Sequence, residues 1–530
     1  MTEAASVIVK IRIGNVKSQI LYDPATYGEY FQSCMDAIDN HTTVVVKDHE
    51  MTPAFQKGYW DGMIHLFNSC TMNKNNLGAF EFYTGKLRTV LEILRRFGYT
   101  VEFIDNRYRP ETGRIEYEWN EKFPPYDFQE EIINTAVAKN RGIIKLATGG
   151  GKTNVAAGVI QKLGVAPFIF FVTTKDLMDQ AYKRFKSLLK TDKIGRIGDG
   201  HCEIYDVNVC TIQTCVMAFG KEEEYLAQQK KMSSLLEGGK TSKEKLVSAE
   251  RYQDIRDLVI NAEGIIFDEI HHAASDTCRM ILEFCDKALF RYGLGATVER
   301  DDGLDKVIEA LFGDYICNIS LSYLIKRGFL IPPTIFMVPQ KDDLGMCENY
   351  QTEYKTYVTE NHTRNQKIAQ CAAAAIGGGL QTLVLVRYIP HGEKLEKMIN
   401  NIAGEGSAIL LHGTLSSAKR KELIGKMQSK ELKCIIATSL ADEGLDIQCL
   451  QCLVLAGSGK SFVKTIQRIG RVIRLDPDNP NKVAIVYDFM DLASKILKKH
   501  SLRRMAIYLE EEMFKVIDMR KQAIKSRKVF

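Results

Sequence analysis

The sequence predicts an α/β protein in which two tandem domains, each with a doubly wound parallel sheet, follow a small α/β domain. Apolar, strand-like runs alternate with helical stretches in residues 123–325, and the same alternation recurs in residues 328–495. The 530 residues are 45% hydrophobic and 26% charged, which is typical of a globular chain. We therefore expect domains at 1–110, 111–325 and 326–497, followed by a tail at 498–530.

The first predicted domain contains both strand and helix patterns. Val7–Ile13 alternates apolar with charged or polar side chains, as a half-buried strand does. Thr43–Val46 and Gly62–Phe67 are further strand candidates. Lys86–Phe97 carries apolar residues at helical spacing with arginines on the opposite face, which predicts an amphipathic helix.

Each of the two larger domains contains five apolar runs of strand length, and strands separated by helices at this spacing predict a parallel sheet. The runs are Gly142–Leu146, Pro167–Thr173, Val207–Thr211, Gly264–Phe267 and Phe290–Leu294, then Thr382–Val386, Ala408–Leu411, Cys434–Ala437, Cys452–Ala456 and Val483–Asp488. Residues 220–257 are polar, carry both charges and predict a helical insertion. Residues 498–530 carry 10 Lys or Arg against 4 Asp or Glu, which predicts a basic helical tail, either solvated or gripping a phosphate backbone.

The bulk composition excludes several classes of protein. The net charge of +5 only weakly favours a polyanionic partner. The 13 cysteines are scattered, without a CxxC pair or zinc spacing, so reduced thiols are expected. The N-terminus lacks a signal pattern, and no apolar run reaches the roughly 18 residues that span a bilayer. We expect a soluble, cytoplasmic protein with no membrane partner.

A glycine-rich loop lies between a predicted strand and a predicted helix. In this loop, Ala147–Thr153, the glycines Gly149, Gly150 and Gly151 let successive backbone N–H groups point at phosphate oxygens. Thr148 belongs to the same loop, Lys152 would neutralise phosphate charge, and the Thr153 hydroxyl would bind Mg²⁺. Leu146 replaces the first glycine of the strict pattern, so a plain glycine-rich turn remains the alternative.

A second pattern supports a nucleotide site. The predicted strand that ends at Phe267 is followed directly by Asp268 and Glu269. Two acids at the end of a buried strand suit metal-assisted hydrolysis, because one can hold Mg²⁺ while the other activates a water. A chance surface turn is the alternative.

Together, Ala147–Thr153 and Asp268–His271 resemble the DExH branch of the superfamily 2 helicases. Further strings match in that family's order: Tyr126–Gln129, Thr173–Leu177, Thr211–Thr214, Gly295–Thr297, Ala437–Asp446 and Gln467–Arg474. The resemblance implies two RecA-like domains of the P-loop NTPase class that bind ATP and Mg²⁺.

The resemblance also implies roles for individual residues. Gln129 would read adenine, and Gly444 and Asp446 would complete the ATP site. Hydrolysis would be coupled to movement through His271, Thr297 and Gln467. The residues expected to contact nucleic acid are Thr174, Gln213, Thr214, Arg387, His412, Gly413 and Thr438.

Two arginines near residue 470 have a physical rationale of their own. Arg471 and Arg474 are three residues apart, so on a helix they would share one face. Guanidinium groups supplied from a second domain would reach the γ-phosphate only when the domains close. A basic helix face is the alternative.

The layout resembles the UvsW-type phage DNA helicases in particular, because a small N-terminal domain with the string Gly58–Ile64 precedes two motor domains. This resemblance implies an ATP-dependent, 3′–5′ DNA helicase or translocase that remodels branched DNA in recombination and repair. Trp60 would either contact a base or fill the core. Ile447 and Gln467 are 20 positions apart (467 − 447), which leaves no room for a long strand-separating hairpin.

DNA is the expected partner, held mostly through its backbone, with a single-stranded-DNA-binding protein or recombination proteins as further candidates. A phage-encoded chain would act in the host cytoplasm. Three alternatives stay open: an RNA helicase of the same branch, the motor subunit of a restriction-type translocase, and a clamp with an inactive ATP site. The intact Lys152, Glu269 and Arg471 argue against the clamp.

Overall fold

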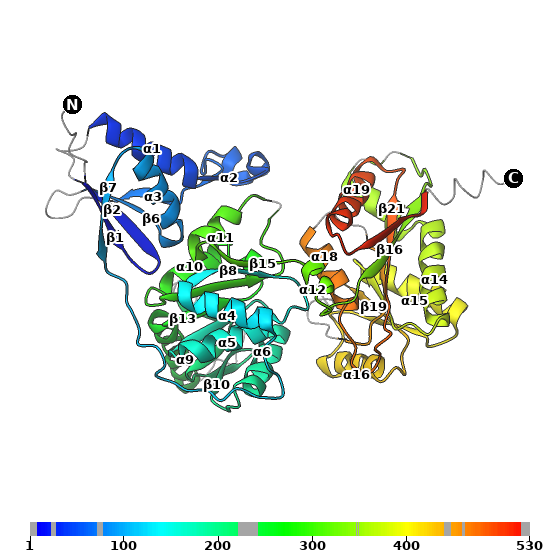
Figure 1. Cartoon of the computed structure of the whole chain (residues 1–530). Helices are drawn as coiled ribbons and strands as arrows, with labels where there is room; N and C mark the ends of the chain where they lie inside the picture. Colours follow the sequence, from blue (N-terminus) through cyan, green and yellow to red (C-terminus); the bar gives the residue numbers. More distant parts are fainter. Residues whose placement is uncertain are drawn as a thin grey trace. The chain divides into compact units, whose positions relative to one another are not determined.

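The computed structural model describes residues 8–22, 28–70, 78–220, 242–300, 302–345, 347, 349–438, 447–457 and 462–520 (Figure 1). At 242–249, 417 and 462–465 the structure describes the backbone alone. The chain forms two compact units: residues 1–146 with 151–318, and residues 319–530 with 147–150. None of the described helices is long and apolar enough to cross a membrane.

The small N-terminal domain is built on a five-stranded sheet of order β5-β6-β2-β1-β7. Side chains of β1 alternate between exposed and buried, as the sequence predicted, and Val9, Ile11 and Ile13 enter the core. The strands are β1 (Ile8–Ile13), β2 (Lys17–Tyr22), β5 (Phe67–Cys70), β6 (Gly78–Tyr83) and β7 (Thr100–Asp105), and the helices are α1 (Glu29–Thr42), α2 (Pro53–Gln56) and α3 (Leu87–Arg96). A separate two-stranded ladder pairs β3 (Val44–Val45) with β4 (Met63–Ile64).

The next domain contains an eight-stranded sheet of order β11-β10-β12-β9-β13-β14-β8-β15. The five predicted strands form its parallel centre as β8 (Arg141–Leu146), β9 (Phe168–Val172), β12 (Val207–Thr211), β13 (Gly264–Phe267) and β14 (Phe290–Gly295). The strands β10 (Ile194–Gly198), β11 (His201–Glu203) and β15 (Tyr315–Ile319) complete its edges. Its helices are α4 (Asp127–Lys139), α5 (Lys152–Leu163), α6 (Lys175–Leu188), α7 (Ile212–Phe219), α9 (Ser242–Asn261), α10 (Asp276–Phe284) and α11 (Asp305–Phe312).

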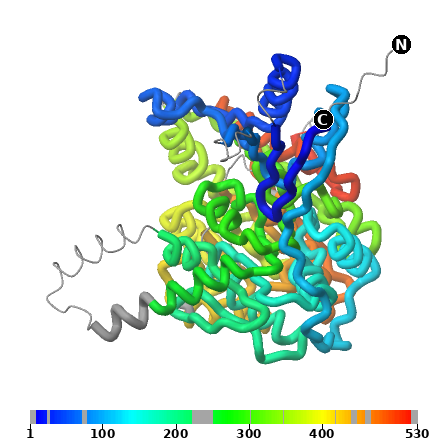
Figure 2. Tube along the Cα trace, turned by 90° about the vertical axis from the view of Figure 1, so that its left-hand side faces the viewer, coloured from blue at the N-terminus to red at the C-terminus, as the bar shows by residue number. Residues whose placement is uncertain are grey.

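Within the first unit, the N-terminal domain is docked on the eight-stranded domain. Lys86 forms an ion pair with Glu309 of α11, and the Tyr83 hydroxyl donates to Glu283 of α10. A Cβ placed on Gly85 would lie 2.4 Å from the Ala310 carbonyl oxygen, so glycine permits this close approach. Figure 2 shows the turn between β1 and β2 (dark blue) beside the green helices of this region.

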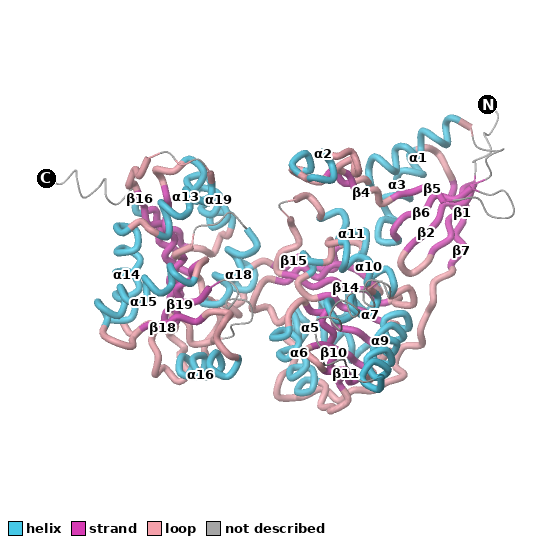
Figure 3. The backbone as a smooth tube through the Cα atoms, turned by 180° about the vertical axis from the view of Figure 1, so that it is seen from behind, coloured by secondary structure: helices cyan, strands magenta, loops and turns pink. Residues whose placement is uncertain are grey.

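The second unit contains a seven-stranded sheet of order β18-β19-β17-β20-β21-β16-β22, and Figure 3 shows helices on both sides of its strands. The strands are β16 (Pro333–Gln340), β17 (Thr382–Val386), β18 (Ala408–Leu411), β19 (Cys434–Thr438), β20 (Cys452–Leu455), β21 (Ala484–Asp491) and β22 (Lys515–Asp518). The helices are α12 (Leu321–Lys326), α13 (Tyr350–Tyr354), α14 (His362–Gly377), α15 (Ile389–Ala403), α16 (Ser417–Gln428), α18 (Phe462–Val472) and α19 (Lys495–Glu510).

The C-terminal segment differs from the basic helical tail that the sequence predicted. Helix α19 packs into the second unit, and β22 adds a parallel strand beside β16. The charge count was misleading here because Arg504 is 4% exposed and forms a buried ion pair with Asp488, 2.8 Å from Nη2 to Oδ1. Residues 521–530 lie outside the described part of the chain.

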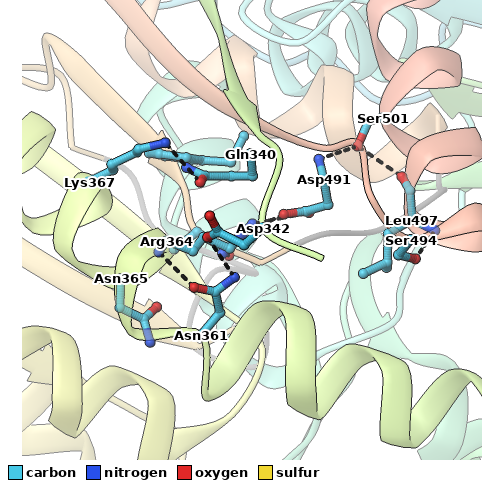
Figure 4. A network of polar contacts seen from close by, with 12 residues as sticks. Gln340, Asp342, Asn361, Arg364, Asn365, Lys367, Asp491, Ser494, Leu497 and Ser501 are labelled. Carbon is cyan, nitrogen blue, oxygen red and sulfur yellow. Dashed lines mark hydrogen bonds and ion pairs between the residues drawn. The ribbon is translucent and has the colours of Figure 1, made fainter. Parts of the chain in front are cut away.

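A buried polar network joins α14, β21 and α19 in this unit (Figure 4). The Arg364 guanidinium donates to Asp491 at 2.7 Å and to the Ala456 carbonyl at 2.7 Å. Ser501 donates to the Leu497 carbonyl, while the Asp491 backbone N–H donates to the Ser501 hydroxyl. Because Arg364 and Asp491 are almost fully buried, each charge depends on the other for compensation.

Candidate nucleotide and nucleic-acid sites

The glycine-rich loop connects β8 to α5, as a phosphate-binding loop requires. Gly149 and Gly151 have φ of +89° and +81°, in the left-handed region that glycine adopts without strain. A Cβ on Gly151 would lie 2.4 Å from Nε2 of Gln129. The Gly150 N–H donates to the Ala147 carbonyl at 3.0 Å, which closes the turn before Lys152 begins α5.

Asp268 and Glu269 follow β13 directly, and the neighbouring strands determine where they lie. The Asp268 N–H continues the ladder to Phe171 of β9 at 3.0 Å. Glu269 then adopts φ +51°, a left-handed conformation that is uncommon for a non-glycine residue and typical of constrained sites. Gly293 of β14 leaves room for the next residue, because a Cβ there would lie 1.9 Å from Cδ1 of Ile270.

The lysine of the loop and the two acids meet at the carboxyl end of the sheet. Lys152 Nζ lies 2.8 Å from Glu269 Oε1 and 4.0 Å from Asp268 Oδ1. His271 Nδ1 lies 3.6 Å from Glu269 Oε2. The structure therefore brings together, in one cluster, a cation for phosphate and two carboxylates for metal-assisted hydrolysis.

Burial and charge separate the pKa values of these groups. Burial raises the pKa of Asp268 to about 6, against the opposing charge of Lys152. Burial also acts to raise the pKa of Glu269, but the charge and hydrogen bond of Lys152 outweigh it and lower that pKa overall. Burial lowers the pKa of His271 to about 4. Glu269 is therefore ionised at neutral pH, as a general base must be, and His271 is neutral.

The residues around Asp268 suit a magnesium ion. Asp268 Oδ1 is buried and accepts no hydrogen bond from the described residues, so a carboxylate oxygen is available to a cation or its water. Thr153 follows Lys152 on the first turn of α5. Gln129 is 1% exposed beside the loop, and its Oε1 accepts a hydrogen bond from the Tyr126 N–H at 3.0 Å.

The segment after β14 contains a link that sequence reasoning missed. Thr297 is buried. Three residues on, the Arg300 guanidinium donates to the His271 carbonyl, and its Nε donates to Asp302 at 2.9 Å. The motif strings contain no sign of this contact, because it joins two loops that are distant in sequence.

The predicted nucleic-acid residues form two groups, one in each unit. Thr174, Gln213 and Thr214 line a single cavity of about 690 Å³ on the eight-stranded domain. In the second unit Arg387, His412 and Thr438 lie at the carboxyl ends of the adjacent strands β17, β18 and β19, and Gly413 follows His412.

Arg387 has an aromatic setting that the sequence did not reveal. Its guanidinium lies 5.2 Å from the ring centres of both Tyr354 and Tyr388. Such cation–π contacts hold a guanidinium in place while it keeps its charge.

The predicted arginine pair is only partly as expected. Gln467 and Arg471 lie on α18, but the helix ends at Val472, so Arg474 is not on the helical face that the spacing predicted. The backbone of Arg474 instead forms an isolated antiparallel β-bridge with Leu330, and its carbonyl accepts a hydrogen bond from Lys482 at 2.7 Å. The approach of both arginines to the nucleotide stays a prediction. Gly444 and Asp446 lie outside the described residues.

Comparison with known proteins agrees with this geometry. Residues 122–300 match the family model described as "Type III restriction enzyme, res subunit", and residues 365–476 match "Helicase conserved C-terminal domain". A protein of Sulfolobus islandicus filamentous virus that is named as helicase 22 is 27% identical over 63% of this chain and 58% of its own length. The "ATP-dependent DNA helicase uvsW" of Enterobacteria phage T4 is 22% identical over 87% of this chain and 88% of its own length.

A solved structure shows the same fold. S. cerevisiae Dbp5 bound to RNA and ADP BeF3 matches with a TM-score of 0.50 and 14% identity, covering 77% of this chain and 94% of that chain. Several curated relatives are longer than the region they share, because the chain spans from 50% to 58% of their length.

The two parallel sheets, the ordered motifs and the two family models show that the chain belongs to the superfamily 2 helicases. Within this superfamily it is similar to the UvsW-type phage helicases, a likeness that extends beyond the motor domains to the N-terminal domain.

Proposed function

We propose that the chain is an ATP-driven DNA helicase or translocase that remodels branched DNA. The observation that carries the proposal is the cluster of Lys152, Asp268 and Glu269 at the carboxyl end of the eight-stranded sheet. A lysine at the start of a helix, beside an available carboxylate and a second, ionised one, is the arrangement that phosphoryl hydrolysis requires.

The ATP site is assembled from the loop and its neighbours. Backbone N–H groups of residues 148–151 cradle the phosphates, and Lys152 moves from the carboxylates to the phosphate charge when ATP enters. Gln129 contacts adenine. Thr153 and Asp268 would hold Mg²⁺, which would supply positive charge to neutralise the phosphates.

Hydrolysis depends on one base and on closure of the two domains. Glu269 accepts a proton from the attacking water. Arg471 and Arg474 stabilise the γ-phosphate in the closed state, and Gly444 and Asp446 complete that state. His271, Thr297 and Gln467 transmit the change, with the Arg300 contact to the His271 carbonyl holding the first of these in position.

DNA binds through its backbone. Thr174, Gln213 and Thr214 contact phosphates on the first motor domain, and Arg387, His412, Gly413 and Thr438 do so on the second. Binding is therefore independent of sequence and sensitive to salt. The 3′–5′ direction rests on relatives such as the "DNA 3'-5' translocase XPB2" of Sulfurisphaera tokodaii.

The branched-DNA specificity rests on the similarity to UvsW and on the short connection from Ile447 to α18. Action in a phage-infected cytoplasm, beside a single-stranded-DNA-binding protein or recombination proteins, belongs to the same proposal.

The test measures ATP hydrolysis and strand separation on single-stranded, forked, four-way, blunt duplex and RNA-containing substrates. We expect forked and four-way DNA to give the highest rates. Equal activity on blunt duplex contradicts the branched-DNA specificity, and stronger stimulation by RNA favours the RNA-helicase alternative.

A further inference from the structure

The cavity that contains Thr174, Gln213 and Thr214 has a wall that does not come from the helicase motifs. We name it the α9 groove, because its outer wall is the C-terminal half of α9, with Arg251, Tyr252 and Ile255. We propose that Arg251 binds a phosphate of the DNA strand in this groove, so that the part of α9 that contains Arg251, Tyr252 and Ile255 belongs to the nucleic-acid site. This inference rests on the function proposed above and adds a residue and an element to it.

The floor of the groove is arranged to receive an anion. Helices α6 and α7 both begin there, with Thr174 and Thr211 as their N-cap residues, so residues of two helix N-termini, where an anion is favoured, line the cavity. Gln213 Nε2 donates to the Thr173 carbonyl at 3.0 Å and joins the two turns. Thr211 and Thr214 share a hydroxyl hydrogen bond of 2.8 Å.

The hairpin between β10 and β11 closes the side of the groove. Gly198 has φ +140°, and a Cβ there would lie 2.6 Å from Thr211 Oγ1, so the hairpin approaches the α7 turn as closely as backbone permits. Lys175 and Asp199 form an ion pair across this side. Among the described residues that line the groove, Asp199 is the one carboxylate, and its ion pair with Lys175 already neutralises it.

Helix α9 is anchored by its inner face and turns Arg251 toward the groove. Ile255, Leu258 and Val259 are buried in the core, and Arg256 Nη1 donates to the Ala218 carbonyl of α7 at 2.8 Å. Tyr252 is half-buried against the same core. The anchoring means that the position of the helix is fixed by packing, without a ligand.

Arg251 itself is exposed and makes no ion pair or hydrogen bond with any residue in the described part of the chain. A guanidinium in this state, beside a cavity lined by helix N-termini, matches the planar, bidentate geometry of a phosphodiester. A cavity of about 690 Å³ is within the usual range for ligand sites and admits a nucleotide unit. The phosphate backbone is favoured over a free anion because the groove also contains the three predicted backbone-contact residues.

The test compares DNA binding by the full chain and by Arg251→Ala and Arg251→Gln, using fluorescently labelled single-stranded DNA at several salt concentrations. We expect the dissociation constant of both variants to rise roughly three- to tenfold at low salt. The plot of log affinity against log salt should lose about one unit of slope, as loss of one phosphate contact requires. Lys183→Ala is the matched control, because Lys183 is an exposed base on α6 that does not line the groove.

The outcomes separate the two proposals. If the wild-type chain binds DNA and the Arg251 variants keep the full salt dependence of binding, the assignment of Arg251 to the DNA site is overturned. The proposed helicase function would then still stand. Wild-type chain whose ATP hydrolysis no nucleic acid stimulates overturns the proposed function instead. Thermal unfolding of each variant identifies a folding defect. If Arg251→Ala does not fold, Arg251→Gln still tests the proposal, because glutamine keeps a long polar side chain without the charge.

Discussion

Lys152 Nζ lies 2.8 Å from Glu269 Oε1, so the lysine proposed to bind phosphate and the proposed general base are in direct contact. The two residues are 117 positions apart (269 − 152), and the parallel order of β8, β14, β13 and β9 brings them to one sheet edge. The contact keeps Glu269 ionised by lowering its pKa. In the proposed function, phosphate charge would compete for the lysine when nucleotide binds, and the carboxylate would then be free to orient water.

Lys152→Ala should reduce ATP hydrolysis by roughly two orders of magnitude or more, because transition-state charge on the phosphates loses its cation. DNA binding should persist, since the lysine is part of the nucleotide cluster and not of the groove. Steady-state ATPase and DNA anisotropy measure the two effects. A variant that loses its fold would show that the lysine has a structural role.

Glu269→Gln should retain ATP binding and lose hydrolysis by roughly two orders of magnitude, since the amide cannot accept the proton of water. The variant should stay longer on DNA in the presence of ATP than the wild type does. Fluorescent-nucleotide binding and DNA dissociation kinetics provide the measurements. Hydrolysis at the wild-type rate would assign the base to another residue.

ATP hydrolysis should fall as pH drops through about 6, because burial raises the pKa of Asp268 to about 6 and protonation removes its negative charge from Mg²⁺. The sign follows from competition: protons and Mg²⁺ bind the same carboxylate, so higher Mg²⁺ should move the acid limb to lower pH. Measurement of the hydrolysis rate against pH at two Mg²⁺ concentrations tests this prediction. If the fall at acid pH does not shift with Mg²⁺, a group other than Asp268 causes it.

Gly151→Ala should weaken nucleotide binding at least tenfold. The residue has φ +81°, and its new Cβ would lie 2.4 Å from Gln129 Nε2, so both the loop and the glutamine must shift. Gly379→Ala is a matched control with φ +76° and open space around its Cβ. The control variant measures the effect of backbone strain without a steric clash. The steric argument would be refuted if both variants lost the same stability and neither changed its nucleotide affinity.

Asp491→Ala should lower the free energy of unfolding by about 3–5 kcal/mol, because the buried Arg364 charge loses its partner. Glu422→Ala removes a carboxylate from exposed ion pairs with Lys419 and Lys426 and should leave the free energy of unfolding almost unchanged. Denaturant unfolding of the two variants compares the effects. Similar losses would mean that the buried pair is compensated elsewhere.

Local patterns in the sequence predicted the centre of both sheets and the nucleotide cluster. All ten strands predicted for the two larger domains occur, because a buried parallel strand is an apolar run whatever its partners are. The loop at 147–153 and the acids at 268 and 269 were predictable because phosphate and metal chemistry need particular residue types at strand ends.

Tertiary structure decided the edges of the sheets, the end of the chain and the α9 groove. Strand β10 contains two glycines and an arginine and is not an apolar run, yet a Cβ on Gly195 would lie 2.0 Å from Asn208 Oδ1 of β12, so glycine is there because a neighbour crowds it. Arg364 and Arg504 count as surface charges in a sequence, and only long-range pairing with Asp491 and Asp488 lets them be buried. Arg251 reaches the groove because α9 packs on α7, a contact between residues that no local pattern connects.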